Sequence, residues 1–289
     1  MTIMEALERA KRLQKGRNGL SVEPTVIAAP SDTGMLKVLH DGVSVEIAER
    51  VEPPEPFCNL QIDAAACAEN RLLCTDDQVA KEKRGAAAYR MLRGRLLHRA
   101  RSGNWTCLGI TSPGPGEGKT VTILNLALAV AREKQRPVYL LDLDMRSPRV
   151  MRYLGVRPPV ELPRYFTEPL QCSDVICQLD IENLYVAGAI EPVTDASELL
   201  ASVRLDELLS AVRRRSPDAL VLLDLPPVLS TDEALVVAPR IDAMFLVIAE
   251  GITRRDGLSK AMQMLGDFNV AGTIINRSGD VAGNDSYYY

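Results

Sequence analysis

The residues best suited to chemistry form a glycine-rich segment at positions 111–120, which reads TSPGPGEGKT. Glycines in such a loop let backbone N–H groups surround phosphates at a helix N-terminus, while the lysine contacts the outer phosphates and the next hydroxyl ligates Mg²⁺. The GxxxxGK[ST] pattern is met except at its first glycine, which Pro113 replaces. A tight turn that caps a helix is the alternative. We predict that the nucleotide contacts are Gly114, Gly116, Glu117, Gly118, Lys119, Thr120 and Val121.

Three aspartates follow short apolar runs. Asp142 and Asp144 come after VYLL, and Asp224 comes after VLL. Ligands of open α/β sheets bind at the carboxyl ends of the strands, so carboxylates there can hold a metal ion and accept a proton. Any one of them could instead cap the next helix. Together with the loop, they predict a Mg²⁺ site formed by Thr120, Asp142, Asp144 and Asp224.

Phosphoryl transfer is the reaction that suits these groups. Lys119, Mg²⁺ and backbone amides would neutralise the transferred phosphate, so we expect Lys119, Asp142, Asp144 and Asp224 to be catalytic. A tyrosine phenol has a pKa of about 10, so a nearby carboxylate must accept its proton as the new bond forms. The segment after Asn276 lacks the NKxD spacing that reads guanine, which favours adenine, with Asn276 contacting the ring.

The elements that must position these groups alternate along the chain. Continuous apolar runs predict strands over 105–111, 138–143, 219–225, 243–249 and 270–276. Helical patterns occupy 84–101, 120–133, 205–215 and 254–265. Because the strands do not alternate between apolar and polar residues, both faces of the sheet should be covered by helices. We predict an α/β P-loop NTPase domain with a doubly wound, mostly parallel sheet over 82–277.

The residues before this domain do not show the same alternation of strand and helix patterns. Thr2, Glu5 and an apolar spacing over 1–16 predict a short amphipathic helix, whose basic face would contact a membrane or simply solvent. From residue 18 to 81 no periodicity is sustained, and residues 53–56 read as a linker, so we expect a weakly ordered lead-in over 1–81. Residues 278–289 form a polar tail that ends in three tyrosines.

Composition excludes several classes of protein. With 289 residues, 46% hydrophobic and 25% charged, the chain can bury a core, and its net charge of −4 argues against a general nucleic-acid binder. No apolar stretch reaches the roughly 20 residues that a membrane span needs. The six cysteines lack zinc-ligand spacing and no apolar signal core begins the chain, so we expect reduced thiols in a cytoplasmic protein.

From residue 87 to 276 the sequence resembles the bacterial tyrosine kinases of capsule and exopolysaccharide synthesis. The resemblance rests on the loop that ends GEGKT, the aspartate pair followed by MRSP, the SELL stretch at 197–200, the run LDLPPVL at 223–229 with Asp232 downstream, and the terminal tyrosines. It implies an ATP- and Mg²⁺-dependent autokinase, with Asp142 as first choice for the tyrosine proton. Tyr287, Tyr288 and Tyr289 would accept phosphate in trans, from a neighbouring subunit.

The resemblance also implies partners. Family members without a membrane span in the kinase chain work with a membrane-spanning activator of the chain-length-determinant type, so we expect this chain to be peripheral at the inner face of the plasma membrane. A cognate tyrosine phosphatase and self-association as a ring or dimer are implied as well. One departure matters: the ExxRxxR motif of the ring-forming helix here has Ala87 in place of glutamate, followed by Arg90 and Arg93.

Two other functions stay open. A ParA/MinD-like positioning ATPase would share the deviant loop and paired aspartates, but such proteins carry a signature lysine where this chain has Gly114, and they do not need a tyrosine tail. A nucleotide-binding scaffold without catalysis would not need Lys119 and the three aspartates. We therefore expect the kinase.

Overall fold

The computed structural model describes residues 37–40, 43–46 and 57–278. The chain divides into two units, residues 1–54 and 55–289. In the first, β1 (Lys37–His40) and β2 (Val43–Glu46) pair antiparallel. The predicted helix at 1–16, the linker at 53–56 and the tyrosine tail at 287–289 lie outside the described residues.

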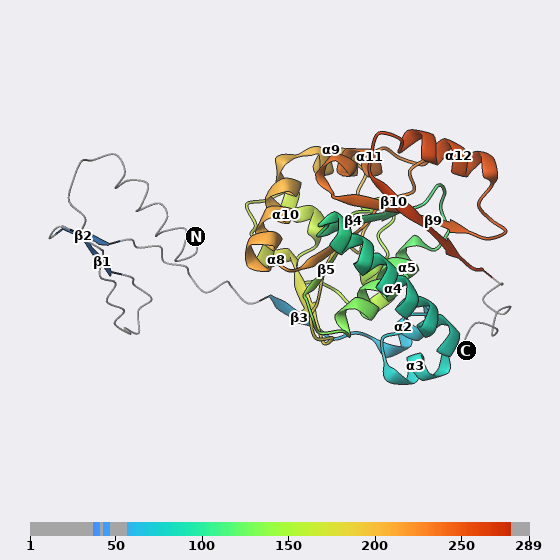
Figure 1. Cartoon of the computed structure of the whole chain (residues 1–289), viewed down its shortest axis with the longest axis horizontal. Helices are drawn as coiled ribbons and strands as arrows, with labels where there is room; N and C mark the ends of the chain where they lie inside the picture. Colours follow the sequence, from blue (N-terminus) through green and yellow to red (C-terminus); the bar gives the residue numbers. More distant parts are fainter. Residues whose placement is uncertain (1–36, 41–42, 47–56, 279–289) are drawn as a thin grey trace. The chain divides into compact units, whose positions relative to one another are not determined.

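An eight-stranded sheet forms the centre of the second unit (Figure 1). The strand order is β10-β9-β4-β8-β5-β7-β6-β3, and all neighbours are parallel except β6 and β7. The strands are β3 (Cys58–Leu60), β4 (Cys107–Thr111), β5 (Val138–Asp142), β6 (Cys177–Leu179), β7 (Leu184–Ala187), β8 (Leu220–Asp224), β9 (Ala243–Ala249) and β10 (Val270–Asn276). The predicted mostly parallel sheet is confirmed.

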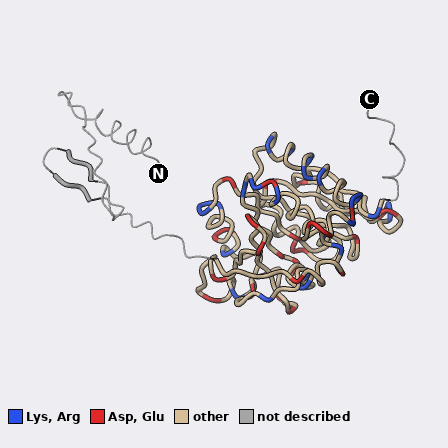
Figure 2. Tube along the Cα trace, turned by 90° about the horizontal axis from the view of Figure 1, so that it is seen from below, with Lys and Arg blue, Asp and Glu red and all other residues tan. Residues whose placement is uncertain are grey.

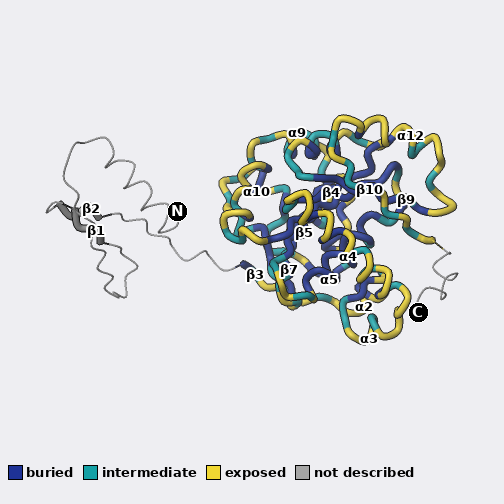
Figure 3. The backbone as a smooth tube through the Cα atoms, viewed as in Figure 1, coloured by how far each residue is buried: buried dark blue, intermediate teal, exposed yellow. Residues whose placement is uncertain are grey.

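Helices cover both faces of this sheet because its strands are apolar on both sides. Along β5, Leu140 packs into one buried cluster with helices α4 (Lys83–Gly103) and α5 (Lys119–Ala131). Tyr139 and Leu141 pack into the other cluster with α10 (Val203–Arg215). The central strands are buried throughout (Figure 3). This is the three-layer, doubly wound arrangement that continuous apolar runs predict.

The four predicted helices are present with ends shifted by a few residues, and several short ones lie between them. They are α2 (Ala64–Glu69), α3 (Asp76–Lys81), α4 (Lys83–Gly103), α5 (Lys119–Ala131), α6 (Val150–Leu154), α7 (Leu162–Thr167), α8 (Cys172–Val175), α9 (Ala196–Ala201), α10 (Val203–Arg215), α11 (Glu233–Val237), the 3₁₀ helix η1 (Ala238–Arg240) and α12 (Arg255–Met264). In the described part of the chain, none of these helices has the length and apolarity to cross a membrane. Basic and acidic residues are interspersed along the trace (Figure 2).

Residues 57–81 correct our expectation of a weakly ordered lead-in. This segment forms the edge strand β3 and helices α2 and α3, and it buries Phe57, Cys67, Leu72 and Leu73. The elements are three to six residues long, too short for a period to show in the sequence. Their order comes from contacts with distant residues, such as the parallel pairing of β3 with β6.

The expectation that all thiols are reduced is also wrong. Cys58 and Cys177 form a disulfide between β3 and β6, and the structure leaves four free cysteines at 67, 74, 107 and 172. The two bonded cysteines are register partners whose Cα atoms lie 4.6 Å apart, within the range that a disulfide spans. They are 119 residues apart in sequence, so spacing alone could not pair them.

Candidate functional site

The ends of three neighbouring strands place the predicted site residues together. Strand β8 lies between β4 and β5, and all three run parallel, so their carboxyl ends share one edge of the sheet. Asp142 and Asp224 are register partners at the ends of β5 and β8. The glycine-rich loop begins where β4 ends at Thr111 and leads into α5, so one edge of the sheet collects the loop and the aspartates.

The loop closes around the N-terminus of α5 through two glycines with left-handed backbone. Gly116 has φ of 77° and Gly118, the residue before the helix, has φ of 88°. Gly118 is also tightly packed, because a Cβ there would lie 2.0 Å from Nδ2 of Asn276. That Asn276 amide donates a 2.9 Å hydrogen bond to the Glu117 carbonyl oxygen. The end of β10 therefore braces the loop directly.

Lys119 lies buried between two carboxylates. Its Nζ donates to Asp144 at 2.6 Å and lies 3.5 Å from Asp224 Oδ1. Burial alone would lower the pKa of Lys119, but Asp224 and Asp144 outweigh it and the pKa is raised. Lys119 is therefore a permanent cation that neutralises buried negative charge at the mouth of the loop.

Asp142 lies behind this pair and is held by the backbone. Its Oδ2 accepts hydrogen bonds from the amides of Arg149 and Val150, both at 2.9 Å, and its Oδ1 accepts from the amide of Asp144 at 3.2 Å. Burial and the nearby charge of Asp224 nevertheless raise the pKa of Asp142 to about 8. Asp142 thus fixes the turn after β5, and its proton equilibrium is near neutral pH.

The residues around Asp224 suit a hard cation such as Mg²⁺. The Thr120 hydroxyl donates to Asp224 Oδ2 at 2.7 Å, while Asp224 Oδ1 is buried without a hydrogen bond. Oxygen ligands are those that Mg²⁺ prefers, and it keeps several waters beside one or two carboxylates. Among the described residues, no three His, Cys, Asp or Glu side chains form a metal cluster of their own. The donor set therefore fits an ion shared between Thr120, Asp224 and phosphate oxygens.

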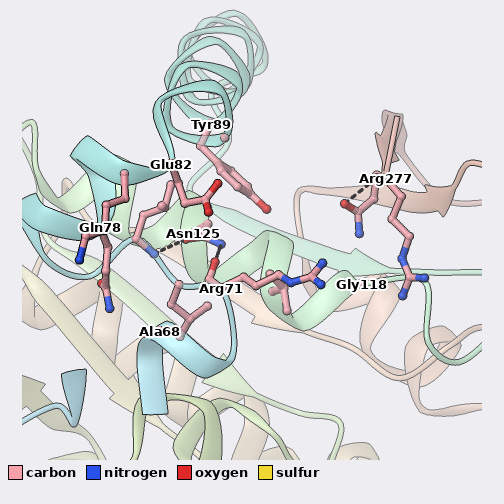
Figure 4. A pocket seen from close by; sticks show the side chains of 14 residues that line it. Ala68, Arg71, Gln78, Glu82, Tyr89, Gly118, Asn125 and Arg277 are labelled. Carbon is pink, nitrogen blue, oxygen red and sulfur yellow. Dashed lines mark hydrogen bonds between the residues drawn. The ribbon is translucent and has the colours of Figure 1, made fainter. Parts of the chain in front are cut away.

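Two cavities meet at the loop. A cavity of about 340 Å³ is lined by Lys119, Thr120, Asp144 and Arg146; we call it the phosphate cavity. A second, of about 630 Å³, lies beyond Gly118 and Asn276 and is walled by Arg71, Tyr89 and Asn125 (Figure 4); we call it the side cavity. Gly118, Val121 and Arg277 line both. A nucleotide with phosphates in the first would extend toward the second.

Comparisons with known proteins agree with this geometry. No family model matches the chain. The tyrosine-protein kinase CpsD of Streptococcus pneumoniae serotype 4 is 29% identical over 129 residues, 44% of this chain and 55% of that protein, so the match spans about half of the relative. The kinase domain of the Escherichia coli tyrosine kinase ETK matches with TM-score 0.61 and 26% identity, covering 70% of this chain and 80% of that one. The chain is similar to bacterial tyrosine kinases in both sequence and fold.

Other solved structures also resemble the chain. The VpsO kinase domain has TM-score 0.61 and 25% identity, and the match covers 68% of this chain and 98% of that domain. McdA of Cyanothece has TM-score 0.50 at 19% identity, covering 59% of this chain and 71% of that one, which shows the fold alone. The predicted likeness to bacterial tyrosine kinases is confirmed, and the fold is shared with McdA.

The structure brings together motifs that lie far apart in the sequence of this chain. Ser197 Oγ donates to Asp232 at 2.9 Å, and Arg146, which lines the phosphate cavity, pairs with the buried Glu233. The MRSP and SELL segments therefore both contact the start of α11, and the MRSP segment also lines the phosphate cavity. Glu117 points away from the cavities, with Oε1 accepting from Thr253 at 2.8 Å, and its role is to hold the loop against the turn after β9.

Sequence reasoning missed several residues around the side cavity. Arg277, next to the predicted Asn276, donates to the Gly116 carbonyl at 3.1 Å. Arg71 and Gln78 line the side cavity from the segment expected to be weakly ordered, and Glu82 lines it from the first position of the predicted domain. The position of Arg277 next to Asn276 could have indicated its role from the sequence. The other residues reach the cavity only because of the way that α2 and α3 fold.

Proposed function

We propose that this protein is an ATP- and Mg²⁺-dependent tyrosine autokinase that phosphorylates its own C-terminal tyrosines and regulates export of a capsular or extracellular polysaccharide. The observation that carries the proposal is the convergence of Lys119, Asp144 and Asp224 at the N-terminus of α5. This arrangement supplies a cation for the outer phosphates and carboxylates for a metal ion and a proton. Kinase relatives with the same fold support the choice of reaction.

Each residue has a part in the proposed reaction. Backbone amides of the loop and Lys119 bind the β- and γ-phosphates, and bound Mg²⁺ would supply charge neutralisation from a site held by Thr120 and Asp224. Loss of the Lys119–Asp144 ion pair on nucleotide binding would leave Asp144 facing the phosphate cavity. Asn276 and Arg277 would bind the adenosine end near the side cavity.

The geometry favours a different proton acceptor from Asp142, the first choice that the resemblance implies. The raised pKa of Asp142, about 8, suits a proton acceptor. Both of its oxygens, however, accept backbone hydrogen bonds, whereas Asp144 lines the phosphate cavity. We therefore propose that Asp144 receives the phenol proton and that Asp142 positions the turn that carries it.

We propose that copies of this chain associate through an interface that does not use the ExxRxxR pattern. Ala87 provides no carboxylate, and Arg93 forms a 2.8 Å ion pair with Glu133 of its own chain and donates to the Ala129 carbonyl oxygen. Arg93 is thereby held against α5. The activator, the phosphatase and membrane attachment remain proposals that follow from the resemblance.

The test is incubation with Mg-ATP, with and without the cytoplasmic tails of membrane activators, followed by phosphotyrosine mapping. Label on Tyr287, Tyr288 and Tyr289 in wild type but not in Lys119→Met would support the kinase. ATP consumption without any phosphotyrosine would favour the positioning ATPase. Nucleotide binding without turnover would favour the scaffold.

A further inference from the structure

Two free cysteines lie within reach of each other beside the side cavity. Cys67, in α2, is completely buried, and Cys74, just before α3, is half-buried. The thiol of Cys74 donates to the sulfur of Cys67 across 2.9 Å. A disulfide bond is about 2.0 Å long, so a movement of less than about 1 Å separates the two states.

We propose that Cys67 and Cys74 form a two-electron redox site that hydrogen peroxide oxidises to a disulfide, which stiffens the wall of the side cavity. The placement of the other cysteines sets this pair apart. Cys58 and Cys177 are already bonded to each other. Cys107 is buried in β4, and burial raises its pKa to about 12, which makes it a poor nucleophile.

The reaction balances with peroxide as the only oxidant. The hydrogen bond from Cys74 lowers the pKa of Cys67, so Cys67 is the better nucleophile of the two. The Cys67 sulfur attacks one peroxide oxygen, the O–O bond breaks, and water leaves with the thiol proton, so that Cys67 becomes a sulfenic acid. The Cys74 sulfur then attacks Cys67, the S–O bond breaks, and a second water leaves with the proton of Cys74. Two electrons pass from the sulfurs to the peroxide, and a dithiol can return them.

The segment between the two cysteines forms part of the cavity wall. Arg71, Leu72 and Leu73 all line the side cavity, and Arg71 has a left-handed backbone with φ of 58°. Asn125 of α5 holds this segment: its Oδ1 accepts from the Leu73 amide at 2.8 Å, and its Nδ2 donates to the Arg71 carbonyl at 3.1 Å (Figure 4). The wall is therefore anchored to the helix that follows the phosphate loop.

A disulfide would restrain this wall near the conformation that it already has. Restraining a binding surface in its bound shape improves affinity because less freedom is lost on binding. Resting on the proposed function, we expect the oxidised protein to bind adenine nucleotide more tightly, on the order of threefold. The redox site itself does not depend on that function.

Peptide mapping of the full chain tests the redox site. The protein is treated with peroxide, alkylated with N-ethylmaleimide and digested with a protease that cleaves before aspartate, which releases residues 63–75 with both cysteines. We expect this fragment to be unalkylated and about 2 Da lighter, since two hydrogens are lost, and to recover both labels after dithiothreitol. Cys74→Ser should abolish the change, and Cys172→Ser, a matched half-buried thiol, should not.

Full alkylation of Cys67 and Cys74 after peroxide treatment, or sulfinic acid without a disulfide, would overturn the redox site. The cavity effect is measured with a fluorescent ATP analogue on oxidised and reduced protein. Tighter binding on oxidation in wild type but not in Cys74→Ser supports it, and equal affinity in wild type overturns it. If the fragment forms its disulfide while neither form binds nucleotide, the proposed function fails and the redox site stands.

Discussion

At the scale of single residues, the site is built around one buried cation. Lys119 is 8% exposed and contacts Asp144 and Asp224, both of which are buried too. Removing one partner of such a group leaves uncompensated buried charge, which costs about 3–5 kcal/mol. The same side chain stabilises the fold without nucleotide and, in the proposed reaction, would bind the phosphates.

Lys119→Met should abolish phosphotyrosine formation, at least about 100-fold, because the outer phosphates lose their main cation. The free energy of unfolding should also fall, because Asp144 and Asp224 lose their partner. Radiolabel from γ-labelled ATP and denaturant titration measure the two effects. Lys134→Met is the control, since Lys134 pairs with Glu182 on the surface. Undiminished labelling of Lys119→Met would contradict the assignment.

Gly118→Ala and Gly116→Ala form a matched pair. Both positions have positive φ, which costs a side chain about 1–2 kcal/mol, but only at Gly118 does an added Cβ meet Asn276, at 2.0 Å, while nothing lies within 4 Å at Gly116. We expect Gly118→Ala to weaken nucleotide binding at least about tenfold more than Gly116→Ala. Calorimetry would measure this, and equal losses would show that Asn276 does not brace the loop.

Asp142 should make stability fall as pH rises. The pKa of its carboxyl is 3.8 when unfolded and about 8 in the folded protein, so between these values the folded state retains a proton that the unfolded state has lost. The slope of unfolding free energy against pH is then negative from about pH 4 to 8. Denaturant titrations without nucleotide should show that the free energy of unfolding of the wild type decreases over this pH range. The decrease should be smaller in Asp142→Asn and unchanged in Asp218→Asn, which replaces an exposed carboxyl group. A wild-type slope unchanged in Asp142→Asn would contradict this origin.

At the scale of elements, the long and strongly apolar helices and strands could be predicted from the sequence, whereas the short ones could not. The strands at 243–249 and 270–276 were placed to the residue, because the first is a continuous apolar run and the second is rich in β-branched residues. Helices α2 and α3 escaped because six residues do not establish a period. The loop and the aspartates were predictable because their spacing carries chemistry. The walls of the side cavity were not, since they depend on contacts across the fold.

The disulfide between β3 and β6 should stabilise the edge of the sheet. It closes a long loop, and removing such a bridge costs about 2–4 kcal/mol. Cys58→Ser with Cys177→Ser should therefore lower the melting temperature measured by circular dichroism. Cys107→Ser is unsuitable as a control because it lies in the core, so Cys172→Ser serves instead. An unchanged melting temperature would show that the strand pairing alone holds β3.

At the scale of the whole molecule, the proposed reaction links the C-terminal tyrosines to the active site of a neighbouring copy. From Asn276 to Tyr287 the chain has 11 steps, a reach of about 36–40 Å if extended. Replacing Tyr287, Tyr288 and Tyr289 by Phe should remove most phosphotyrosine and leave ATP binding intact. Mass spectrometry after Mg-ATP incubation measures the sites, and label mainly on Tyr89 or Tyr153 would refute the role of the tail.

The contacts at the end of β10 give the loop a mechanical connection. Asn276 and Arg277 donate hydrogen bonds to the carbonyl oxygens of Glu117 and Gly116, and the next residues lead into the tail. A force applied to the chain at residue 278 would therefore reach the phosphate loop through these two hydrogen bonds. The nucleotide site would then respond to tension at the end of β10.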